Sequence, residues 1–185
     1  DLEEAIFDVM DMLSPLAAQK HIDMAFYYAD NIPTQMVGDA LRFKQILTNL
    51  ISNAIKFTPD GEIIVRVRME DDDIGQCLLH FSVQDSGIGL SGTDRKKLFE
   101  SFSQGDASVT RQFGGTGLGL AISKQLVHLM HGQIGFEDNQ ERAPTEKGST
   151  FWFTASFKVD EQDEFVEHPH FDHLKVVSYR SEERR

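Results

Sequence analysis

Cysteine is almost absent from this chain. Its 185 residues include a single cysteine, Cys77. One thiol cannot form an intramolecular disulfide, and it is too few for a cysteine-based metal cluster. The composition therefore excludes the disulfide-stapled class of small secreted domains. We expect a domain of the reducing cytoplasm that is held together by its hydrophobic core.

Positive charge is also scarce. The chain has 18 Lys and Arg residues against 30 Asp and Glu residues, which gives a formal net charge of -12. Such an acidic chain repels nucleic acid, so we expect no nucleic-acid partner. A phosphate ligand would have to be held locally, by oriented N–H groups, a metal ion and a few basic side chains.

Long hydrophobic runs are missing as well. Neither end carries an apolar stretch as long as a membrane-spanning helix or a signal peptide. We therefore expect a soluble domain without direct membrane contact. The length suffices for one ordinary domain with a sizeable core.

Helical spacing of apolar residues predicts three helices. The first contains Leu2, Ile6, Val9, Met10, Leu13 and Leu16 on one face, and the second covers residues 37–57. The third follows a glycine-rich loop and runs for roughly four turns to Gly132, with Ile122, Leu126, Leu129 and Met130 at helical spacing.

Alternation of apolar and polar residues predicts strands at 22–28, 63–69, 77–83, 133–136 and 151–157. An acidic turn at 70–73 should join two of them into a hairpin. Because each strand has one apolar face, helices should cover a single side of a mixed sheet. We predict an α/β two-layer sandwich.

The second helix has a polar row opposite its apolar stripe. The stripe consists of Ile46, Leu47, Leu50, Ile51 and Ala54, and the row consists of Arg42, Gln45, Asn49, Asn53 and Lys56. Helix interiors disfavour Asn, because its side chain competes for backbone hydrogen bonds. Two asparagines one turn apart beside a lysine therefore indicate ligands for a hydrated cation and a phosphate. A merely solvated helix face is the alternative.

Two segments are rich in glycine. The stretch GGTGLGL at 114–120 would let the backbone approach a polyphosphate at the positive end of the third helix. A flexible hinge is the alternative reading of these glycines. The second segment, DSGIG at 85–89, follows a strand, and by itself it is typical of a turn.

Taken in order, five motifs resemble the N, G1, F, G2 and G3 boxes of sensor histidine kinases. They are NLISNAIKF at 49–57, DSGIG at 85–89, FESF at 99–102, GTGLG at 115–119 and GSTF at 148–151. Residues 103–106 and Arg111 are similar to bacterial hybrid kinases of the BarA and GacS type. The resemblance covers roughly residues 1–157 and implies the Bergerat (GHKL) fold, a mixed sheet with helices on one face.

The resemblance implies a role for each matching residue. Asn53 would coordinate Mg²⁺, Asn49 and Lys56 would contact the phosphates of ATP, and Asp85 would accept a hydrogen bond from the adenine amino group. Asn49, Lys56 and Arg111 are the catalytic candidates. The remaining nucleotide-binding candidates are Phe57, Gly87, Ile88, Gly89, Gly115, Thr116, Gly117, Leu118, Gly119 and Thr150. Residues 94–114 would form the ATP lid, with Phe99 and Phe102 at its base.

The implied function is transfer of the γ-phosphate of Mg·ATP to a histidine on a separate helical dimerisation domain. A downstream receiver or response regulator and a homodimeric, membrane-anchored parent would be the partners. No phosphoacceptor motif occurs in this chain. One alternative is a nucleotide-binding regulatory partner of another sensor kinase. A GHKL ATPase is the other, but such ATPases use a glutamate where Asn49 stands, and Asn cannot take up a proton.

The remaining segments depart from the family pattern. The loop at 138–147 is longer and more charged than the family's short turn, and its role stays open. Residues 158–173 read as an acidic linker, and residues 174–185 as the truncated start of a receiver-like domain. The linker ends in His168, His170, Asp172 and His173, which fit a zinc-hydrolase pattern without its structural context, so we expect no zinc site there.

Overall fold

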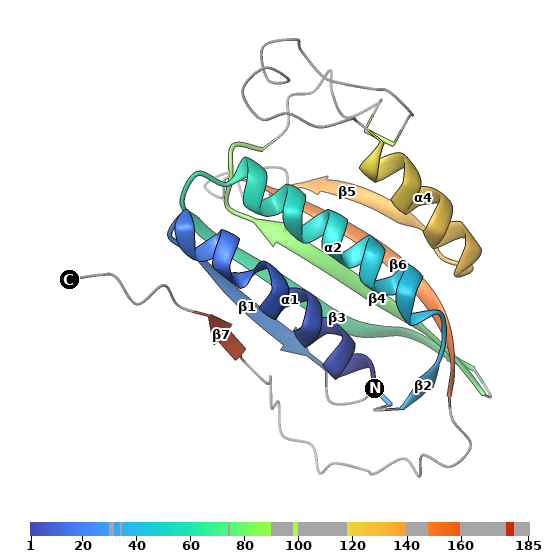
Figure 1. The fold of residues 1–185 in the computed structure, drawn as a ribbon. Coiled ribbons are helices and arrows are strands. Elements are labelled where there is room, and N and C mark those ends of the chain that lie inside the picture. The colour runs from blue at the N-terminus through green and yellow to red at the C-terminus, as the bar shows by residue number, and fades with distance from the viewer. Residues whose placement is uncertain are drawn as a thin grey trace.

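A computed structural model describes this chain at residues 1–29, 32–33, 35–73, 75–89, 98–99, 118–139, 148–159 and 177–179. Within these residues, helices cover one face of a seven-stranded mixed sheet (Figure 1). The helices are α1 (Leu2–Gln19), α2 (Ala40–Phe57) and α4 (Gly119–Leu129). This arrangement confirms the predicted two-layer sandwich.

The sheet has the strand order β2-β6-β4-β3-β1-β7, and β5 also pairs with β6. Its strands are β1 (Ile22–Tyr28), β2 (Met36–Val37), β3 (Gly61–Asp73), β4 (Gln76–Asp85), β5 (Ile134–Asp138), β6 (Ser149–Val159) and β7 (Val177–Tyr179). β1 and β3 are parallel, and the other pairs are antiparallel. As a result, β4 ends beside the start of β6, with Asp85 opposite Ser149.

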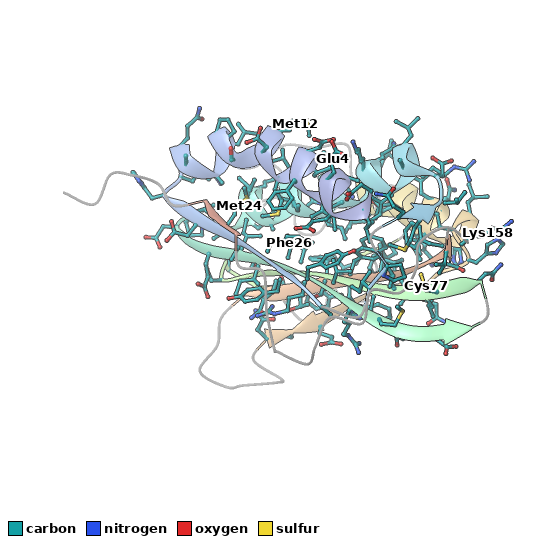
Figure 2. The ribbon with its side chains drawn as sticks, turned by 90° about the horizontal axis from the view of Figure 1, so that it is seen from below. Glu4, Met12, Met24, Phe26, Cys77 and Lys158 are labelled. Carbon is teal, nitrogen blue, oxygen red and sulfur yellow. The ribbon has the colours of Figure 1, made fainter. Side chains whose placement is uncertain are left out.

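The core fills the space between the helices and one face of the sheet. Phe43 of α2 lies 5.0 Å, between ring centroids, from Phe81 of β4, and Phe81 stacks on Phe153 of β6 at 4.7 Å. Figure 2 shows Met24 and Phe26 between α1 and the sheet, with Met12 on the outer side of α1. These buried side chains hold the helices on the sheet, because each Å² of apolar surface removed from water stabilises the fold by about 25 cal/mol.

Two helix predictions need correction at their ends. Leu16 was expected on the buried face of α1, but it is 50% exposed, and Ala17 is buried instead, four residues after Leu13. The second helix begins at Ala40 and not at residue 37. Met36 and Val37 pair with β6 as a short strand, and the Asp39 side chain caps the helix by accepting the Arg42 N–H at 3.0 Å.

The predicted hairpin of β3 and β4 is confirmed, but its acidic turn is not. Residues 70–73 belong to β3, and the turn lies beyond Asp73. A shift in register between Met69 and Asp71 marks a bulge, which lets the strand continue past Glu70.

The third helix is shorter than expected and is rotated about its axis. It has 11 residues, and its buried positions include Ala121, Ser123 and Val127. Ile122 and Leu129, both expected to pack on the core, are 39% and 58% exposed. Leu126 and Met130 do pack against the core. Contacts with α2, described below, set this rotation.

The described part of the C-terminal segment extends the same sheet. β7 pairs antiparallel with β1, with Ser178 opposite Ala25 (Figure 1). A separate receiver-like domain from residue 174 stays a prediction. No helix in the described ranges has the length and apolar character needed to cross a membrane.

Lys20 ties the end of α1 to the end of α2. Its Nζ donates hydrogen bonds to the carbonyls of Ile55 at 2.7 Å, Lys56 at 3.0 Å and Thr58 at 3.4 Å. These carbonyls lie at the C-terminal end of α2, where backbone acceptors have no partner within the helix and the dipole favours a cation. The three hydrogen bonds from Lys20 therefore fix the last turn of α2.

We expect Lys20→Met to lower the free energy of unfolding by about 1–3 kcal/mol, because partly buried carbonyls lose a charged donor. Lys44→Met is the matched control. Lys44 also joins the two helices, through Asp8 at 2.6 Å, but this pair is exposed and worth at most about 1 kcal/mol. Urea denaturation of both variants measures the difference, and equal losses would contradict the role assigned to Lys20.

Candidate functional site

The polar row of α2 meets the first turn of α4. Asn49 Nδ2 donates a hydrogen bond to Ser123 Oγ at 2.9 Å. A Cβ at Gly119 would overlap the amide oxygen of Asn49, so any other residue there would displace the Asn49 side chain. The structure thus brings the asparagine motif and the end of the glycine-rich segment together.

No side chain of the described residues caps the start of α4. Its N-cap residue is Leu118, whose side chain cannot accept a hydrogen bond from the first turn. The first backbone bond of the helix runs from the Ile122 N–H to the Leu118 carbonyl at 2.9 Å. The preceding N–H groups and the positive end of the helix dipole therefore suit an anion beside Asn49.

The C-terminal end of α2 meets the turn after β4. The Ile88 N–H donates to the Phe57 carbonyl at 3.3 Å. A Cβ at Gly87 would lie 2.5 Å from that carbonyl, so Gly87 is required for the contact. Lys56 Nζ lies 5.0 Å from the centroid of the Phe57 ring. Residues predicted for the phosphate and base ends of one nucleotide therefore share a helix.

Asp85 is a buried carboxylate at the end of β4, only 3% exposed. Oδ1 accepts the Gly87 N–H at 2.9 Å, and Oδ2 accepts the Ser149 hydroxyl at 2.6 Å. Burial raises the pKa of the Asp85 carboxyl above its ordinary value, and the hydrogen bonds from Ser149 and Gly87 oppose this rise. The side chain is thus held by donors in a place where a charge is poorly solvated.

Three residues of the candidate site were not singled out by the sequence analysis: Ser123, Ser149 and Asn139. Asn139 Nδ2 donates a hydrogen bond to the Asp85 carbonyl at 3.0 Å. The hydroxyl of Thr150 donates to Asn139 Oδ1 at 2.8 Å, so Ser149 and not Thr150 reaches the Asp85 carboxylate. Strand alternation could have indicated Ser149, but no sequence pattern indicates Asn139.

Only some of the other predicted site residues lie within the described part of the chain. Asn53 and Lys56 are half-buried on the polar row, Gly89 has φ +70, and the Ile88 side chain is 62% exposed. Arg111, Gly115, Thr116, Gly117, Phe102 and the histidines of the tail lie outside the described residues. Phe99 is described and half-buried. The described ranges contain no group of three or more His, Cys, Asp or Glu residues that could ligate a metal.

Comparison with known proteins decides the family. Residues 38–159 match the family of histidine kinase-, DNA gyrase B-, and HSP90-like ATPases. The chain belongs to this family. The predicted recognition and the GHKL fold are therefore confirmed.

Three relatives place the chain more closely. Sensor histidine kinase GacS of Pseudomonas protegens is 44% identical over 88% of this chain and 17% of GacS. Signal transduction histidine-protein kinase BarA of Escherichia coli is 38% identical over 82% of the chain and 16% of BarA. Full-length ShkA, in a crystal structure with AMPPNP, shares 34% identity with a TM-score of 0.70, covering 86% of this chain and 31% of ShkA. The chain thus spans about a sixth of the two curated relatives.

Because the pKa of Asp85 is raised in the folded protein, the free energy of unfolding should depend on pH. A raised folded-state pKa favours the protonated form in the folded protein, so stability is gained as pH falls toward the ordinary value of 3.8. Relative to Asp85→Asn, the parent should gain stability between pH 7 and that value, over the interval in which the pH falls through the raised folded-state pKa. Urea denaturation across this range measures the difference, with Asp11→Asn on the exposed face of α1 as the control. A difference that stays flat, or runs the other way, would contradict the assignment.

Proposed function

We propose that this chain is the ATP-binding catalytic domain of a sensor histidine kinase. It binds Mg·ATP between α2, α4 and the ends of β4 and β6, and it transfers the γ-phosphate to a histidine on a separate helical domain. One observation carries the proposal. The Asn49–Ser123 hydrogen bond sets the polar row of α2 beside the uncapped start of α4, where an anion fits.

At the phosphate end, the residues of this chain hold and orient the nucleotide. The first N–H groups of α4 would donate to phosphate oxygens, and Asn49 and Lys56 would contact them from α2. Oriented donors of this kind stabilise charge that develops during transfer. Leu118 and Gly119 contribute their backbone, while the roles of Arg111, Gly115, Thr116 and Gly117 rest on the family resemblance alone.

Asn53 is the proposed magnesium ligand. It follows Asn49 by one helical turn on the same half-buried row, and amide oxygens are among the ligands that Mg²⁺ accepts. When bound, Mg²⁺ neutralises charge on the β- and γ-phosphates. Asn53 thereby fixes the position of the phosphates relative to the start of α4.

Asp85 would read the base beside the C-terminal end of α2. An ionised carboxylate only accepts hydrogen bonds, and adenine offers its N6 amino group where guanine offers the O6 acceptor. Gly87 and Gly89 let the chain pass close to the base, and Phe57 borders it. The neighbouring Ser149 hydroxyl keeps the carboxylate oriented.

Phosphotransfer is favoured over hydrolysis. The Asn49 amide cannot remove a proton from water, and its Nδ2 is engaged by Ser123. The names of GacS and BarA as histidine kinases also support transfer. Domain boundaries at 157 and 173, a dimeric parent, a downstream receiver or response regulator, and a membrane-anchored cytoplasmic location remain parts of this proposal.

We expect the chain alone to bind Mg·ATP without becoming labelled from γ-labelled ATP. A longer protein that includes the helical domain should be labelled on histidine, because the acceptor is then present. Calorimetry and acid-lability of the label measure these outcomes. Stable label on the isolated chain would contradict the proposal. Binding without any transfer in the longer protein would favour a regulatory partner, and release of inorganic phosphate without labelling would favour an ATPase.

Asn53→Ala should weaken Mg-dependent ATP binding about tenfold, since one metal ligand is lost. Asn53→Asp should weaken it as well, because it adds a negative charge near the phosphates. Gln45→Ala, two turns earlier on the same row, is the control and should change little. Calorimetry with and without Mg²⁺ tests the role, and an alanine variant that binds Mg·ATP like the parent would exclude it.

The parent should bind ATP at least about tenfold more tightly than GTP, because an unpaired buried acceptor costs about 1–3 kcal/mol. Asp85→Asn is nearly isosteric and replaces one acceptor with a donor, so it should erode this preference. Affinities of both proteins for both nucleotides provide the test. If Asp85 only forms a turn, the ATP-to-GTP ratio will be the same in parent and variant.

A further inference from the structure

Asn139 is a buried polar residue with two partners in the proposed base site. Asn139 is the first residue after β5, and it is only 3% exposed. Nδ2 donates to the main-chain carbonyl of Asp85 at 3.0 Å, and Oδ1 accepts the Thr150 hydroxyl at 2.8 Å. A single amide therefore connects the end of β4 with the start of β6.

The Asp85 carbonyl is enclosed on a second side by Gly148. This glycine has φ +98, and a Cβ there would overlap the Asp85 carbonyl oxygen. The chain entering β6 thus passes directly against the atom that Asn139 binds. Ser149 of β6 pairs with Asp85 of β4 on one side and with Asp138 of β5 on the other. The position of the Asp85 backbone is set by these contacts together.

The Asp85 carboxylate depends on the same geometry. It takes its donors from Gly87 and Ser149, which lie on the two segments that Asn139 holds together. The Gly87 bond is local to the turn, but the Ser149 bond crosses to β6, so a small displacement of the end of β4 relative to β6 would lengthen it. The Thr150 hydroxyl fixes the orientation of the Asn139 amide, because it donates to the oxygen and leaves the nitrogen facing Asp85.

We propose that Asn139 is a positioning residue for base selection, which holds the ends of β4 and β6 so that the Asp85 carboxylate meets adenine in its productive orientation. This inference rests on the proposed function, in which Asp85 reads the base. It also gives the first residue after β5 a role in the proposed base site.

The test compares ATP and GTP affinities of the parent with those of Asn139→Ala. We expect ATP affinity to fall about five- to tenfold and the ATP-to-GTP ratio to fall about threefold or more, because the carboxylate loses its fixed orientation. Thr150→Val, which removes the hydroxyl that orients the amide, should shift the ratio in the same direction. Thr150→Ser keeps the hydroxyl and should restore the parent ratio.

Thr154→Val is the matched control. Thr154 is also buried on β6, and its hydroxyl oxygen accepts the Gln133 N–H at 2.9 Å at the start of β5. It lies about 13 Å from Thr150 along the strand, since strands rise about 3.3 Å per residue. This variant should lose stability in urea without changing the nucleotide ratio. A purely structural role for Asn139 predicts the same behaviour for Asn139→Ala.

The Asp85→Asn variant distinguishes base reading by Asp85 from the positioning role of Asn139. If Asp85→Asn erodes the ATP-to-GTP ratio while Asn139→Ala and Thr150→Val leave it unchanged, the positioning role is overturned and base reading by Asp85 stands. If all three variants keep the parent ratio, base reading by Asp85 is overturned, and the positioning role with it. A shift in the ratio with Asn139→Ala and Thr150→Val, but not with Thr154→Val, supports the role of Asn139.

Discussion

The placement of α2 is the constraint on which the rest of the site depends. Its apolar face, with Phe43 among the aromatic rings of β4 and β6, is buried in the core and fixes the helix over the sheet. Its polar row is then presented to α4 through Asn49. Its last turn is clasped by Lys20 and touches the turn after β4 through the Phe57 carbonyl. One amphipathic helix therefore sets the distance between the two ends of the proposed nucleotide site.

The second requirement is a carboxylate kept in place where water is scarce. Burial opposes ionisation of Asp85, while donors from Gly87 and Ser149 favour it. A group balanced in this way discriminates between ligands, because an unpaired buried acceptor is costly and a matching donor relieves that cost. In the proposed site, the polar contacts of Asn139, Ser149 and Thr150 would therefore serve selectivity as well as the stability of the sheet edge.

Much of this structure could be predicted from the sequence, because the decisive signals are local. Apolar periodicity predicted the sandwich, and the order of the motifs predicted the family. The errors have non-local causes. Val37 leaves the predicted helix because, together with Met36, it pairs with the distant end of β6. Ile122 and Leu129 are exposed because the packing of α4 against α2 and the core turns Ala121, Ser123 and Val127 inward. Asn139 had no sequence signal, since its partners are 54 and 11 residues away.

The central claim is that the start of α4 and the turn after β4 form two ends of one site. The most direct measurement is an NMR titration of the chain with Mg·ATP that follows the amide of Gly87 and those of Gly119, Leu120 and Ala121. The account predicts that both sets of resonances shift with a single dissociation constant, and that Mg·ADP shifts both as well. Shifts confined to one end, or different dissociation constants for the two ends, would contradict it.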